Sequence, residues 1–97
     1  MMKQHLVSTN KGYHAHPYYL QFALRFAAED ISDLVSSFNR QVNNNGWGSI
    51  RAYHDRALID EFVNRGIDIS CITGGQSIDF KHPVRYDMSE NKLVAIA

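Results

Sequence analysis

The chain has 97 residues, 44% of them hydrophobic, which predicts one globular domain over residues 1–97 with a modest core and no separate cofactor domain. Ten basic and ten acidic side chains give a formal net charge of zero, so no global field attracts the protein to nucleic acid or to an anionic membrane. The sequence shows no signal-peptide run or membrane-spanning stretch, and its single cysteine excludes an internal disulfide. We therefore expect a soluble, cytoplasmic protein.

The N-terminal part of the chain is predicted to form strands. Lys3 to Thr9 has the pattern of a short strand, and the turn residues that follow permit a hairpin into Tyr13 to His16. Pro17 interrupts ladder pairing, so a strand at this point lies at a sheet edge or is bent. From Tyr19 to Phe26 a large apolar side chain occupies every second position. This period of two predicts a half-buried strand.

The clearest helix follows an acidic cap. Asp30 can accept hydrogen bonds from the free amides of a first helical turn, and Arg40 suits the negative end of the helix dipole in the last turn. Between them the apolar residues recur at helical spacing on one face, and the run Asn-Asn-Asn-Gly at 43–46 is a stop signal. The pattern predicts a helix from about Ile31 to Val42.

The stretch from Trp47 to Gly66 permits either one long helix or a strand followed by a helix. On a single straight helix Ile50, Tyr53 and Ala57 would lie on the side opposite Leu58, Ile59, Phe62 and Val63, which requires two apolar faces. We therefore predict a strand over Ser49 to Tyr53 and a second helix from about Asp55 to Arg65. Glu61 and Arg65 form an i, i+4 ion pair there, and Gly66 ends the helix.

A hairpin is predicted over Ile67 to His82. The Gly74-Gly75 dipeptide suits a two-residue type I′ turn, which would set Thr73 opposite Gln76. This register gives the hairpin an apolar face, with Cys71 opposite Ile78 and Ile69 opposite Phe80, and a polar face, with Asp68 opposite Lys81.

The C-terminal part of the chain predicts a second hairpin. Val84 to Met88 alternates, and Leu93 to Ile96 forms a last strand. A loop at Glu90 to Lys92 would set Tyr86 opposite Ile96. Together the elements predict an α+β fold, a two-layer sandwich. A mixed, mostly antiparallel sheet of about five to six strands would carry the two amphipathic helices on one face.

The segment from Tyr13 to Tyr19 is rich in aromatic and imidazole rings. One interpretation is a loop or edge strand whose rings cover one end of the core. A second is a recognition surface, because rigid aromatic side chains are common binding anchors. Its candidate residues, together with the loop tryptophan, are Tyr13, His14, His16, Tyr18, Tyr19 and Trp47.

A metal site is the third interpretation of the same segment. On a strand His14 and His16 project to one face, an arrangement that suits two ligands of a divalent transition metal. His5 joins them as a third ligand in one register of the first hairpin and faces away in the other. Apart from this alternative, no cofactor is expected.

No residue is assigned a catalytic role. Cys71 is expected to be a core residue of the hairpin. His54 and Asp55 resemble a base with its orienting carboxylate, but the favoured interpretation is that Asp55 caps a helix and His54 ends a strand.

We therefore expect a small non-catalytic binding or regulatory protein that acts through a protein partner or as a homodimer. A homodimer would pair through the Leu93 to Ile96 edge strand, which carries no charge after Lys92. Nucleic acid and membranes are not expected partners. The alternative is a small metal-dependent protein or enzyme that uses the segment with His14 and His16.

Overall fold

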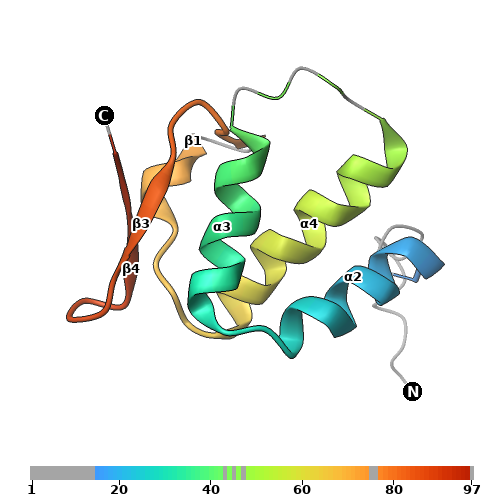
Figure 1. The fold of residues 1–97 in the computed structure, drawn as a ribbon, viewed down its shortest axis with the longest axis horizontal. Coiled ribbons are helices and arrows are strands. Elements are labelled where there is room, and N and C mark those ends of the chain that lie inside the picture. The colour runs from blue at the N-terminus through green and yellow to red at the C-terminus, as the bar shows by residue number, and fades with distance from the viewer. Residues whose placement is uncertain (1–14, 43, 45, 47, 75–76, 97) are drawn as a thin grey trace.

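The computed structural model describes residues 15–42, 44, 46, 48–74 and 77–96. Within these ranges the helices are α2 (Pro17–Ala27), α3 (Ile31–Gln41), α4 (Ser49–Asn64) and the single 3-10 turn η2 (Ser70–Ile72). The strands are β1 (Thr73–Gly74), β2 (Ser77–Ile78), β3 (Val84–Asp87) and β4 (Lys92–Ala95). In Figure 1, α4 lies between α2 and α3, and the β3–β4 hairpin lies on the far side of α3.

The predicted strand from Tyr19 to Phe26 is wrong, because this segment is helix α2. Pro17 stands in the first turn, where its missing N–H costs nothing. The residues that face the core recur at helical spacing, with Phe26 fully buried and Tyr19 and Phe22 packed against it. Leu24 should share the face of Phe26 in a strand, yet its side chain is 75% exposed. Phe22 and Phe26 are four residues apart, so they share a face both in a strand of period two and in a helix. The alternation therefore predicted a strand where the chain forms a helix.

Helix α3 confirms the prediction made from its cap and its single apolar face. The Asp30 carboxylate accepts a hydrogen bond from the Asp33 backbone N–H at 3.0 Å. Leu34 and Phe38 are fully buried in the core, and Arg40 lies in the last turn. The helix ends at Gln41, one residue before the predicted end.

Helix α4 is continuous, so the predicted strand over Ser49 to Tyr53 is wrong. It packs against both α2 and α3 (Figure 1), and its buried apolar residues are Ala57, Leu58, Ile59 and Phe62. The predicted end is confirmed. Gly66 has a φ of +75°, its N–H donates to the Val63 carbonyl, and the Ile67 N–H donates to the Phe62 carbonyl. These two bonds form a Schellman cap.

The predicted hairpin over Ile67 to His82 is reduced to two short strands. Thr73 pairs with Ile78 and Gly74 with Ser77, so the predicted register is wrong. The residues between, 75 and 76, lie outside the described ranges. Asp68 does not face Lys81 but forms an isolated parallel bridge with Lys92, and the chain then enters η2.

The predicted C-terminal hairpin is present, but the register predicted for it is also wrong. Val84 pairs with Ala95, and Tyr86 pairs with Leu93. The predicted partner of Tyr86 was Ile96, which lies three residues later in the chain. Asn91 adopts a φ of +53° in the longer connection between the strands. This left-handed conformation is one that asparagine tolerates better than most residues.

The α+β class holds, whereas the two-layer sandwich with about five to six strands is wrong. The described residues form two two-stranded antiparallel sheets, β1–β2 and β3–β4, and the isolated parallel bridge between Asp68 and Lys92. The main apolar side chains come from the helices, so the core lies between helices, with the β3–β4 hairpin closing one side. The predicted strand Lys3 to Thr9 lies outside the described residues. No described helix is long and apolar enough to cross a membrane.

Candidate functional site

Three rings gather where α2 begins. His16 caps α2, and its Nδ1 accepts a hydrogen bond from the Tyr18 backbone N–H at 3.2 Å. The His16 ring stacks on Tyr53 of α4, with ring centroids 4.2 Å apart, and lies 5.5 Å from the Tyr18 ring. Tyr18 is 42% exposed. The cluster therefore joins the start of α2 to α4 and presents an aromatic surface.

Arg51 connects α4 to the chain that precedes it. Its Nε donates to Asp55 Oδ2 at 3.1 Å. Its Nη atoms donate to backbone carbonyls at the end of α3 and in the following connection, those of Gln41, Asn44 and Gly46. The Asp55 side chain is 7% exposed and that of Arg51 is 14% exposed. This ion pair therefore holds the α3–α4 connection against α4 with its charge largely removed from water.

His54 shares the same carboxylate. Its Nδ1 lies 2.9 Å from Asp55 Oδ1. Because a carboxylate only accepts hydrogen bonds, Nδ1 carries the proton in the neutral ring and Nε2 is left as an acceptor. The Phe22 and Phe26 rings pack nearly perpendicular to the imidazole, at centroid distances of 5.1 Å and 5.2 Å. Packing and the carboxylate together fix the orientation of the imidazole ring.

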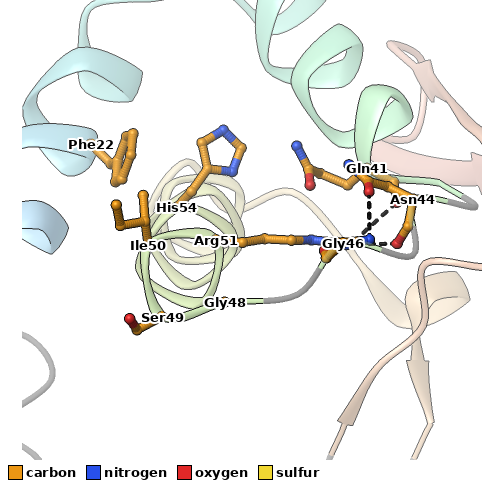
Figure 2. Close-up of a pocket in the computed structure, with 9 residues that line it drawn as sticks. All are labelled: Phe22, Gln41, Asn44, Gly46, Gly48, Ser49, Ile50, Arg51 and His54. Carbon is orange, nitrogen blue, oxygen red and sulfur yellow. Dashed lines mark hydrogen bonds between the residues drawn. The ribbon is translucent and has the colours of Figure 1, made fainter.

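A pocket of about 560 Å³ opens beside this network. Figure 2 shows the His54 ring projecting from α4, with Phe22 on one side and the side chain of Gln41 on the other. Four parts of the chain line it, namely α2, the end of α3, the connection that Arg51 holds and the start of α4. The lining residues are Phe22, Gln41, Asn44, Gly46, Gly48, Ser49, Ile50, Arg51 and His54.

The structure brings together only part of the predicted recognition surface. His16 and Tyr18 belong to the ring cluster. Tyr19 turns elsewhere, and its hydroxyl donates to Asp60 Oδ2 of α4 at 2.6 Å. Tyr13, His14 and Trp47 lie outside the described residues.

The predicted metal ligands His5 and His14 also lie outside them. Among the residues that the structure describes, no three His, Cys, Asp or Glu side chains are placed to hold a metal ion. The metal site therefore stays a prediction.

Other residues of the site were missed. Phe22 was assigned to a strand, and Ile50 and Tyr53 to a separate short strand, so their approach was not foreseen. Helical spacing between Tyr19 and Phe22, and between Ile50 and Tyr53, was the available signal. Asp55 does not cap a helix, because α4 begins six residues earlier, at Ser49.

Two further expectations fail in the hairpin region. Cys71, expected in the core, is exposed in η2, although partial desolvation raises the pKa of its thiol. The Leu93 edge of β4 is not open, since the Leu93 N–H donates to the Asp68 carbonyl and the Asp68 N–H donates to the Asn91 carbonyl. The dimer predicted through that edge loses this support and is otherwise untested.

Comparison of the chain with family models, curated proteins and solved structures gives no match in any of the three. Function therefore has to be argued from the ring cluster and the pocket themselves.

Proposed function

We propose that the protein is a non-catalytic binding module that takes a segment of a protein partner at the α2–α4 surface. This surface consists of the ring cluster and the adjoining apolar wall of the pocket, and its residues are His16, Tyr18, Phe22, Ile50 and Tyr53. The observation that carries the proposal is a pocket of about 560 Å³ beside exposed apolar side chains.

The composition of the surface supports binding. Ile50 lines the pocket and is 52% exposed, and Tyr18 is 42% exposed. Aromatic anchors beside a pocket are typical of residues that dominate interface energetics, because large rigid rings bury much area and lose little entropy. A volume of this size falls in the range of ligand pockets, about 300–1,000 Å³.

The electrostatics favour an uncharged segment of the partner. Among the described residues that line the pocket, Arg51 is the only Lys, Arg, Asp or Glu, and it is engaged by Asp55 and by three backbone carbonyls. A ligand carboxylate would have to compete with all four acceptors. An apolar or aromatic side chain of the partner avoids that competition and buries Phe22 and Ile50.

Selection from a displayed library of random peptides tests the proposal. We expect enriched peptides that shift the backbone NMR signals of Tyr18, Ile50 and Tyr53 on titration. Failure to enrich any peptide would contradict the proposal, as would peptides whose shifts map to the β3–β4 hairpin.

The metal-dependent protein or enzyme based on His14 and His16 stays an alternative. No described contact favours it, because His14 lies outside the described residues.

A further inference from the structure

His54 contributes a hydrogen-bond acceptor to the lining of the pocket. His54 Nδ1 is bound to Asp55, and Nε2 has no hydrogen-bond partner among the described residues. Figure 2 shows the ring directed away from the α4 axis into the space between Phe22 and Gln41. An acceptor held in place by a buried carboxylate is organised in advance to receive a donor from a ligand.

A second polar group faces the same space. Figure 2 shows the side chain of Gln41 reaching from the end of α3 toward the His54 ring. Its amide has no hydrogen-bond partner among the described residues, and a primary amide can both donate and accept. Figure 2 shows the Phe22 ring and the Ile50 side chain beside the His54 ring, on the side away from Gln41. The pocket therefore combines an apolar wall with two adjacent hydrogen-bonding groups.

We propose that the pocket takes an aromatic ring that carries a hydroxyl group, namely the tyrosine side chain of the partner segment. The ring packs against Phe22 and Ile50, and its hydroxyl donates to His54 Nε2 while it accepts from the Gln41 amide. A phenol is uncharged at neutral pH and both donates and accepts. It thus matches the pocket in charge and in hydrogen bonding. This inference rests on the proposed function, because it names the side chain that the α2–α4 surface recognises.

Three small ligands test whether the hydroxyl group of the ligand contributes to binding, and all three are used with the wild-type protein. N-acetyl-tyrosinamide has the donor, its O-methyl derivative keeps the oxygen but loses the donor, and N-acetyl-phenylalaninamide lacks both. In NMR titrations of the wild-type protein followed at Ile50 and His54, we expect the tyrosine probe to bind roughly three- to tenfold more tightly than either of the others. Equal affinities for the three probes would overturn the inference, as would no binding of the tyrosine probe.

A variant of His54 then tests whether His54 Nε2 accepts the hydrogen bond from the ligand hydroxyl. His54→Phe keeps a ring between Phe22 and Phe26 but removes the acceptor, and Asp55 retains its bond from Arg51. We expect the preference for the tyrosine probe over the phenylalanine probe to disappear in this variant. A preference that persists in folded His54→Phe would overturn the assignment to His54.

The two proposals fail differently. Equal binding of the three probes removes the hydroxyl contact but leaves the partner surface standing. Failure of the peptide selection, or peptides that bind elsewhere, removes the surface itself.

Discussion

Arg51 and Asp55 form an ion pair one turn apart on α4, with Arg51 Nε 3.1 Å from Asp55 Oδ2. The pair matters beyond α4, because the same guanidinium binds three carbonyls of the chain between Gln41 and Gly46. One wall of the pocket is therefore fixed by a single side chain.

Replacing Arg51 should lower the stability of the folded protein substantially. Arg51→Met leaves the nearly buried Asp55 without its cation and three carbonyls without their donor. We expect the free energy of unfolding, measured by denaturant titration, to fall by about 3 kcal/mol. The control is Arg25→Met, which breaks a looser i, i+4 pair with Glu29 at 3.5 Å and 50% exposure of the arginine side chain. That loss should stay below about 1 kcal/mol. Equal losses in both variants would contradict this role of Arg51.

Alanine substitutions at Phe26 and Leu24 test whether residues 17–27 form a helix. Phe26→Ala should lower the free energy of unfolding by about 3–5 kcal/mol, because a fully buried ring is lost. Leu24→Ala should change it by less than about 0.5 kcal/mol, because that side chain is 75% exposed. In a half-buried strand both residues would share the core face. Comparable losses in the two variants would therefore favour the strand.

The side-chain amide of Asn39 joins α3 to the β3–β4 hairpin through two hydrogen bonds. Asn39 Nδ2 donates to the Val84 carbonyl at 3.0 Å, and the Val84 N–H donates to Asn39 Oδ1 at 2.8 Å. Asn39→Ala leaves both backbone groups of a buried residue without these partners and should cost about 2 kcal/mol in unfolding free energy. Hydrogen exchange of the Val84 amide should accelerate as well. Asn64→Ala, at the exposed end of α4, is the control and should be nearly neutral.

Stability at low pH should depend on the cap of α3. Hydrogen bonds from the Asp33 N–H and from the Ser32 hydroxyl lower the pKa of the Asp30 carboxyl below its ordinary value of 3.8. A lowered pKa in the folded state means that the stabilisation is complete above pH 3.8 and is lost as the pH falls through the folded-state pKa.

Asp30→Asn keeps the capping acceptor but does not titrate. Thermal unfolding of this variant should therefore lose less stability between about pH 4 and pH 2 than the wild type does. Identical losses over that range would show that Asp30 does not contribute to the acid response.

The success with α3 and the failure with α2 have a common physical origin. In α3 the Asp30 cap, the apolar period and the Arg40 position all indicate a helix, so local signals agree. In α2 the side chains of Phe22 and Phe26 fit two periods. Only burial of Tyr19 and exposure of Leu24, which depend on where α4 lies, decide between them.

Helix α4 was divided because a surface helix has one apolar face. This helix instead packs against both α2 and α3, a tertiary arrangement that the local pattern does not encode. The strand registers failed for a related reason. The ladder of β1 and β2 is only two residues long, and a connection longer than predicted sets the pairing of β3 and β4.

In the candidate site, too, the feature that lies within one segment was predicted from the sequence, and the feature formed by several elements was not. The ring-rich segment was singled out, and two of its described members, His16 and Tyr18, form an aromatic cluster, whereas Tyr19 binds Asp60 instead. The pocket could not be foreseen, because Phe22, Gln41 and Ile50 come from three different elements that meet only in the folded chain.

Calorimetry of one enriched peptide against two variants of α4 tests the binding surface most directly. Ile50 and Val63 are 52% and 53% exposed on the same helix, but of the two only Ile50 lines the pocket. We expect Ile50→Glu to weaken binding at least about tenfold and Val63→Glu to leave it within about twofold of the wild type. Binding that is unchanged in folded Ile50→Glu, or weakened equally in both variants, would contradict the assignment of the α2–α4 surface.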